Sequence, residues 1–446
     1  MDELTTSSFK TTGSKWLLPV SDFFGFPLDQ VNFLACQVFA LGAAFWFRFY
    51  LSPHFSSPVV RHAVATLFGL SFVIFCFGPC SQSELNVSSR YTMIMAISYL
   101  AVCQVSRIKT GLVAVLQTGM CKKREDLTAD QRLHAVDSKP SLIEYLSYNL
   151  NFLSILVGPC SHYKDYIDFI EGRHVQRRLS GSNTGQNGYD KVPEPSPMAA
   201  VTRKLLICGV CMVLFLTLTK AFPITYNVDS HFVNEAPFLT RLAYAFFSIQ
   251  AARPKFYFAW TLADAINNAA GYGFKGVDEA GQVSWDLISN ISIWEIETAT
   301  SFKKFIDNWN IQTGVWLKTV CYDRAPRYPT ALTFILSALW HGVYPGYYFT
   351  FITAIPITLA ARAVTRGPLR PIYFLSSYPV KLVYDVVTWA ATQLCICYTV
   401  MPFLLLAVGP TMQYYRSMYF HIHIISILTV IAQPQLQPSN NNVKRK

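Results

Sequence analysis

Charged side chains are scarce in this 446-residue chain: Asp, Glu, Lys and Arg make up only 14% of it, whereas 52% is hydrophobic. A soluble globular domain carries about 25% charged residues. Here the deficit recurs in successive apolar runs that short polar clusters separate, which is typical of polytopic α-helical membrane proteins. We therefore predict an all-α transmembrane fold with about nine to eleven membrane segments.

The sequence also lacks the motifs of several common enzyme classes. It has no HExxH zinc motif, no Walker A loop, no GxSxG nucleophile and no carboxylate-rich metal cluster. No serine or cysteine has an obvious adjacent base, so nothing favours an acyl-enzyme route. Cys208 and Cys211 have CxxC spacing but lie within the apolar run Leu205–Leu218, which favours packing over zinc or redox chemistry. We expect no metal and no bound cofactor.

The net charge of +11 is carried by basic residues that lie between the apolar runs. Cytoplasmic loops of membrane proteins collect Lys and Arg, and anionic lipid headgroups attract them. We therefore expect membrane lipid, and no nucleic acid, as the partner. A cleavable signal peptide is not evident, because the first apolar run, Val31–Trp46, begins too late for one.

The polarity of the chain predicts three parts: a polar segment over 1–30, a membrane domain over 31–432, and a basic tail over 433–446. Within the membrane domain, residues 175–198 are rich in Gly, Ser, Asn and Pro and predict a disordered loop. We expect Asp165–Glu171 to form an amphipathic surface helix.

Further membrane helices are expected from the apolar runs. Arg253-Pro254-Lys255 is expected to join two of them, Leu239–Ala251 and Phe256–Ala270. Gly342–Gly346 is expected to separate Thr330–Trp340 from Tyr347–Leu359. The remaining candidate segments are Ala63–Phe77, Tyr91–Val105, Gly111–Met120, Ser141–Cys160, Val383–Val408 and Met418–Ile431.

His341 is the first residue that could carry chemistry, since it ends an apolar helical run. Ser337 lies four residues earlier, on the same helix face, and Trp340 directly precedes the histidine. A neutral, buried imidazole can accept a proton near pH 7. The alternative is a histidine that only caps the end of a helix.

Asn310 is the second, and it follows Trp309 in an aromatic, apolar stretch. A carboxamide there could hold a hydroxyl group or stabilise an oxyanion. The alternative is an interfacial asparagine that points to water.

Two polar stripes on otherwise apolar segments are further candidates for binding substrate. Asp264, Asn267 and Asn268 share one helix face, and Glu144 belongs to a second stripe. Such stripes in a membrane either line a cavity or lock helices together. The residues leave both possibilities open.

Two motifs carry a resemblance to a known family. The stretches are Trp309-Asn310-Ile311-Gln312-Thr313 and Trp340-His341-Gly342-Val343-Tyr344-Pro345-Gly346-Tyr347-Tyr348. Through them the chain resembles the membrane-bound O-acyltransferases, and most of all their lysophospholipid acyltransferase branch. The resemblance covers nearly the whole chain.

The resemblance implies a multi-pass enzyme of the endoplasmic reticulum membrane, with helices around a central tunnel. It implies acyl-CoA as co-substrate, with a preference for oleoyl-CoA, and lysophosphatidylserine or lysophosphatidylethanolamine as acceptor. By the same resemblance, His341 is the catalytic base and Asn310 its partner. Trp309, Ser337 and Trp340 are then expected near the substrate. The oligomeric state does not follow.

The N-terminal third looks shorter than the family pattern, after Gly78 and between Ile108 and Leu127. Loss of helices there could open the tunnel. A catalytically silent membrane protein of the same family is therefore the main alternative. A transporter, with Asp264 and His341 on an ion path, is a third, although no pair of broken helices recurs in two halves.

Overall fold

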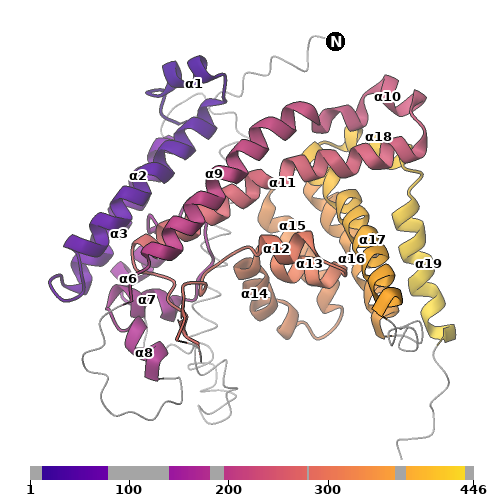
Figure 1. Cartoon of the computed structure of the whole chain (residues 1–446). Helices are drawn as coiled ribbons and strands as arrows, with labels where there is room; N and C mark the ends of the chain where they lie inside the picture. Colours follow the sequence, from indigo (N-terminus) through magenta and orange to yellow (C-terminus); the bar gives the residue numbers. More distant parts are fainter. Residues whose placement is uncertain (1–12, 79–139, 181–194, 279–280, 367–377, 437–446) are drawn as a thin grey trace, which may run out of the picture. The chain divides into compact units, whose positions relative to one another are not determined.

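The structure is a computed structural model, which describes residues 13–78, 140–180, 195–278, 281–366 and 378–436. Nearly all of its regular structure is helical, which confirms the predicted all-α class (Figure 1). The strands of the described part are β1 (Gly276–Val277) and β2 (Val283–Ser284), which pair antiparallel.

Five helices of the described residues are long and apolar enough to cross a membrane. They are α2 (Leu28–Tyr50), α3 (Pro58–Phe77), α9 (Met198–Ala221), α16 (Pro345–Arg366) and α17 (Tyr378–Leu405). The polytopic membrane architecture is thereby confirmed. The expected segments Tyr91–Val105 and Gly111–Met120 lie outside the described residues, so the higher total stays a prediction.

The chain forms two compact units. Unit 1 holds Met1–Cys208 and Ala259–Ser289, and unit 2 holds Gly209–Phe258 and Asn290–Lys446. Both candidate catalytic residues, His341 and Asn310, belong to unit 2, whereas both polar stripes belong to unit 1.

Unit 1 combines the membrane helices α2 and α3 with short helices. These are α1 (Leu18–Phe24), α6 (Leu142–Leu150), α7 (Tyr163–Ile170) and α8 (His174–Ser180). A glycine lets α3 approach the end of α6: a Cβ on Gly69 would lie 1.7 Å from the carbonyl oxygen of Leu150. The apolar stretch Ser141–Cys160, which includes α6, is a short helix followed by turns, and it does not form a membrane span.

One expectation about unit 1 was wrong. The helix expected at Asp165–Glu171 is α7, but it is buried rather than superficial: Asp165 and Asp168 are 8% and 5% exposed. The cause lies in α8, where Arg178 pairs with Asp165 at 3.0 Å and Arg177 pairs with Asp168. These pairs also order the first part of the loop expected over 175–198, of which 181–194 lie outside the described residues.

Unit 2 is organised around α16, which packs against α15 (Pro329–His341), α17 and α19 (His421–Leu436). Its smaller helices are η3 (Ile224–Val228), α10 (Ser230–Glu235), α12 (Ile293–Glu297), α13 (Phe302–Asn308), α14 (Ile311–Val320), η4 (Tyr322–Arg324) and α18 (Val408–Ser417). The break between α15 and α16 falls where Gly342–Gly346 predicted it. Helix α19 continues four residues past the expected end of the membrane domain at residue 432.

The expected helix pair around Arg253-Pro254-Lys255 is one helix, α11 (Phe238–Ala269), with Pro254 inside it. A proline in a helix forfeits one backbone hydrogen bond. Contacts on either side of it offset this cost. Arg253 forms an ion pair with Glu297 at 3.1 Å, and the Tyr257 hydroxyl donates to the same carboxylate.

Candidate active site

His341 is the last residue of α15, and glycine ends that helix. Gly342 has φ = 122°, a conformation that side-chain-bearing residues rarely adopt. Three residues later Pro345 begins α16, as the fixed φ of proline favours at a first helical position. The backbone thus turns sharply next to the imidazole, and α16 starts beside it.

The hydrogen bonding of His341 selects one tautomer of its ring. Its Nδ1 lies 2.7 Å from the carbonyl oxygen of Ser337. A carbonyl only accepts, so Nδ1 carries the proton and donates it. In the neutral ring Nε2 then holds the free lone pair, and it bonds to no residue that the structure describes. This nitrogen is therefore able to accept a proton.

Aromatic rings surround the imidazole. The ring centroids lie 4.6 Å from Trp340, 4.8 Å from Phe351, 5.3 Å from Phe403 and 5.7 Å from Tyr347. The side chain is half-buried among them. Such apolar surroundings disfavour the charged imidazolium and keep the ring in its proton-accepting form.

A second glycine of the motif holds α16 against the end of α17. The amide of Gly346 donates to the carbonyl of Leu406 at 2.8 Å. A Cβ at this position would lie 2.1 Å from the carbonyl oxygen of Pro402. Glycine is therefore required here, and the close approach brings Phe403 of α17 to the histidine.

Asn310 directly precedes α14 in the left-handed conformation, with φ and ψ both 50°. Asparagine is one of the few non-glycine residues that tolerate it. An asparagine before a helix commonly caps the helix with its side chain, but this one does not. Its half-buried carboxamide forms no hydrogen bond within the described part of the chain, so it is available to a ligand.

Asn290 performs the capping instead. Its Oδ1 accepts from the amide of Gln312 at 3.0 Å, and its carbonyl accepts from the amide of Ile311 at 2.8 Å. Ile291 and Trp309 form an antiparallel bridge beside it. Asn290 is 5% exposed. This residue holds the start of α14 in place, and sequence reasoning missed it because its role depends on contacts 21 and 22 residues along the chain.

Trp309 lies in an aromatic cluster. Its ring stacks on Phe305 at 5.8 Å and contacts Phe256 at 5.7 Å. The helix that Asn310 precedes, α14, packs against α15, which ends at His341. The structure thus brings the segments of Asn310 and His341 into one unit, with Trp309, Ser337 and Trp340.

The polar stripe of α11 is engaged with protein groups. Lys204 of α9 forms an ion pair with Asp264 at 2.7 Å and donates to Asn268 at 2.8 Å. The Ser289 hydroxyl donates to Asp264 at 2.6 Å. Asn267 donates to the carbonyls of Leu153 and Ala263. These contacts are those of a helix lock; a role in binding substrate stays a prediction.

Glu144 has a structural role in α6. It forms a capping box with Ser141, in which each side chain bonds the other residue's backbone amide. The Tyr163 hydroxyl also reaches it at 3.5 Å. Burial, with a smaller effect of the Glu144 carboxylate, raises the pKa of Tyr163, so this phenol stays protonated. The capping box is thus a structural role of Glu144, and a role in binding substrate stays a prediction.

The chain is similar to known proteins over most of its length. The family model described as MBOAT, membrane-bound O-acyltransferase family, matches residues 83–405, which include both motifs. The chain is 51% identical to membrane-bound glycerophospholipid O-acyltransferase 1 of Mus musculus, over 98% of each chain. It is 48% identical to membrane-bound glycerophospholipid O-acyltransferase 2 of Homo sapiens, over 95% of this chain and 88% of that one.

A more distant relative is lysophospholipid acyltransferase 6 of Drosophila melanogaster, 35% identical over 96% of this chain and 66% of that one. The alignment with the mouse protein is longer than the chain itself, 484 positions against 446 residues, so at least 38 positions (484 minus 446) have no counterpart here. The chain is thus shorter than this relative, and the expected place of the shortening, in the N-terminal third, stays a prediction.

Proposed function

The chain belongs to the membrane-bound O-acyltransferase family and is a multi-pass membrane acyltransferase, and on that premise we propose that it transfers a fatty acyl chain from acyl-CoA to the free hydroxyl of a lysophospholipid. The names of the relatives support phospholipid remodelling as the setting. We further propose oleoyl-CoA as donor, lysophosphatidylethanolamine or lysophosphatidylserine as acceptor, and the endoplasmic reticulum membrane as location.

The observation that carries the proposal is the state of His341. With Nδ1–H bonded to the Ser337 carbonyl, the free Nε2 can take a proton from a hydroxyl group. A general base must lie within hydrogen-bonding reach of its proton and be unprotonated at working pH. The aromatic rings around His341 meet the second condition, because they keep the imidazole unprotonated. The helical break after His341 leaves its ring at the end of α15, where a substrate can approach.

The proposed reaction needs no covalent enzyme intermediate. The lysolipid hydroxyl gives its proton to His341 Nε2 while its oxygen attacks the thioester carbonyl. A tetrahedral oxyanion forms and collapses, the carbon–sulfur bond breaks, and the thiolate of CoA takes the proton from the imidazolium. The ester and CoA leave, and His341 is neutral again.

Two roles of Asn310 fit its free carboxamide. Its amide could donate to the oxygen of the lysolipid hydroxyl and orient it, or it could donate to the oxyanion. Removing one such oxyanion donor costs about 10²–10³ in kcat in well-studied enzymes.

Acyl transfer in detergent micelles tests the proposal directly. Oleoyl-CoA is offered with a panel of lysophospholipids to the wild type, to His341→Ala and to His231→Ala. His231 is a matched control, because its side chain is 76% exposed and pairs only with Glu235 among the described residues. We expect His341→Ala to abolish turnover and His231→Ala to retain it. Unchanged turnover in His341→Ala would exclude the histidine as base.

A second proposal competes with the first: the chain is a catalytically silent member of the family. This second proposal is favoured by the positions of the mouse protein that have no counterpart in this chain. A long-chain acyl-CoA stabilises only a protein that still binds it. Absence of both turnover and thermal stabilisation, in monodisperse wild-type protein, would support the silent form.

A further inference from the structure

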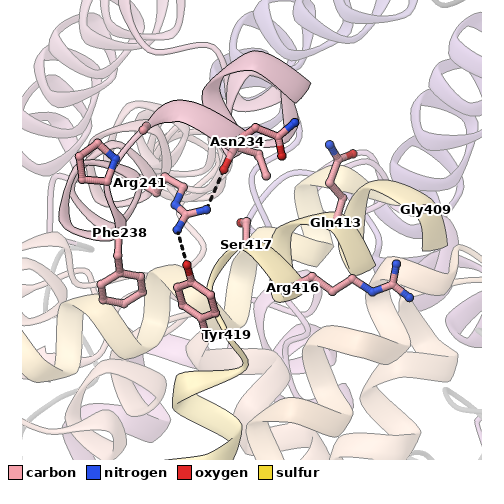
Figure 2. Close-up of a pocket in the computed structure, with 11 residues that line it drawn as sticks. Asn234, Phe238, Arg241, Gly409, Gln413, Arg416, Ser417 and Tyr419 are labelled. Carbon is pink, nitrogen blue, oxygen red and sulfur yellow. Dashed lines mark hydrogen bonds between the residues drawn. The ribbon is translucent and has the colours of Figure 1, made fainter.

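A cavity of about 750 Å³ lies in unit 2, between residues 233–241 and residues 409–419 (Figure 2). The first segment is the turn from α10 into α11, and the second is most of α18 with the turn that follows. Small-molecule sites typically have volumes of about 300–1,000 Å³. None of the four aromatic residues around His341 lines this cavity, so its walls are not those of the candidate active site.

Arg241 forms one wall of the cavity and is only 8% exposed. It donates to the carbonyl of Val233 at 2.8 Å and to the hydroxyl of Tyr419 at 3.3 Å (Figure 2). Its guanidinium carbon also lies 5.4 Å from the centre of the Tyr419 ring. All of these partners are neutral. Its Nε has no hydrogen-bond partner among the residues that the structure describes.

A buried cation is normally paired with an anion. Arg253 of the same helix shows the usual arrangement, because it pairs with Glu297 at 3.1 Å. Arg241 forms no ion pair with a carboxylate of the described residues. The negative charge that would compensate it is therefore one that a ligand can supply.

The rest of the cavity wall also favours an anion. Arg416 of α18 contributes a second, exposed guanidinium, and no Asp or Glu is among the lining residues. Phe238 begins the 32-residue helix α11, and Gly409 lies in the first turn of α18. Helix N-termini attract anions through their free amide groups and the helix dipole. The two guanidinium groups and both helix N-termini therefore all favour a bound anion.

The cavity also offers groups suited to the rest of a lipid headgroup. Gln413 and Asn234 provide amide hydrogen-bonding groups, whereas Pro237 and Phe238 provide apolar surface (Figure 2). A bare inorganic ion would leave this apolar wall unused. An arginine fork matches the oxygens of a phosphate better than a lysine does.

We propose that this cavity binds the phosphate group of a glycerophospholipid, with Arg241 and Arg416 as its cationic ligands. The occupant is a membrane lipid held outside the aromatic pocket of His341. The binding needs no acyl-CoA and no turnover, so it can be measured apart from the proposed acyl transfer, and either can fail without the other.

The test uses the full-length protein in neutral detergent and calorimetric titration with dioctanoylphosphatidic acid. Dioctanoylglycerol, which has the same chains without phosphate, and inorganic phosphate are titrated in parallel. The variants are Arg416→Gln, which changes an exposed side chain, and Arg241→Lys, which keeps the charge but loses the planar fork. Arg327→Gln is the matched control, since Arg327 is exposed and does not line the cavity.

We expect phosphatidic acid to bind the wild type and the Arg327→Gln protein equally. Hydrogen bonds to charged groups are strong, so we expect each cavity variant to raise the Kd about tenfold or more. Equal binding of dioctanoylglycerol, or full affinity in Arg416→Gln and Arg241→Lys, would overturn the proposal. Inorganic phosphate that binds as tightly as the lipid would overturn the assignment to a lipid.

Discussion

Replacing Asn310 by glycine separates the chemistry of its side chain from the conformation of its backbone. The residue has φ and ψ of 50°, a conformation that costs an alanine about 1–2 kcal/mol and costs glycine almost nothing. Asparagine could therefore be present for its backbone alone. Asn310→Gly removes the carboxamide and preserves the conformation, whereas Asn310→Ala removes the carboxamide and strains the backbone.

We expect the two variants to differ in stability but not in activity. For a unit of this size, about 1 kcal/mol lowers Tm by about 2–4 °C, so Asn310→Ala should melt a few degrees below the wild type and Asn310→Gly close to it. Both should lose about 10²–10³ in kcat if the carboxamide stabilises an oxyanion. The measurements are thermal unfolding and oleoyl transfer from oleoyl-CoA. Full activity of Asn310→Gly would refute the catalytic role of Asn310.

The kinetic constants of Asn310→Gly then distinguish the two roles of the carboxamide. A donor that orients the lysolipid hydroxyl contacts it in the ground state, so its loss should raise the KM for the lysolipid. A donor to the oxyanion acts only in the transition state, so its loss should lower kcat and leave that KM unchanged. Titration of the lysolipid at saturating oleoyl-CoA separates the two results.

Three further predictions concern the supports of the site. Gly346→Ala should lower the free energy of unfolding by about 1–3 kcal/mol, because its Cβ would meet the Pro402 carbonyl at 2.1 Å; an unchanged Tm would contradict this. Asn290→Ala should cost about 1 kcal/mol through the lost helix cap and reduce kcat, and reduced stability with normal kcat would show that it does not position Asn310. Lys204→Met should cost about 3–5 kcal/mol by leaving Asp264 unpaired, and Asp264→Leu added to it should restore much of that loss, as chemical denaturation can measure; no recovery in the double variant would argue against the pair as a helix lock.

The sequence predicts best the features that local rules decide. The end of α15 and the start of α16 follow from Gly342 and Pro345, whose backbone preferences act within a residue or two. The membrane helices follow from composition over some 20 residues. The apolar context of His341 was visible in the same way, although its tautomer depends on the Ser337 carbonyl in a formed helix.

The features that were missed depend on contacts distant in sequence. Pro254 suggested a helix break, but the ion pair between Arg253 and Glu297 spans 44 residues and stabilises the continuous helix. Asn290 lies 20 residues from Asn310 and caps α14 in its place, so the carboxamide of Asn310 is not used as the cap. Lys204 lies 60 residues from Asp264 and forms a buried ion pair with it, and the pattern of the polar stripe alone does not predict this partner. No local pattern carries this information.

The contact between the start of α16 and the end of α17 makes the glycine-proline motif depend on sequence that follows it. A product that ended between residues 349 and 402 would keep Asn310, His341 and the whole motif. It would nevertheless lack Phe403, which packs on the imidazole, and Leu406, which accepts the Gly346 amide. A search for the two motifs alone would therefore accept such a product, although the surroundings of His341 would be incomplete.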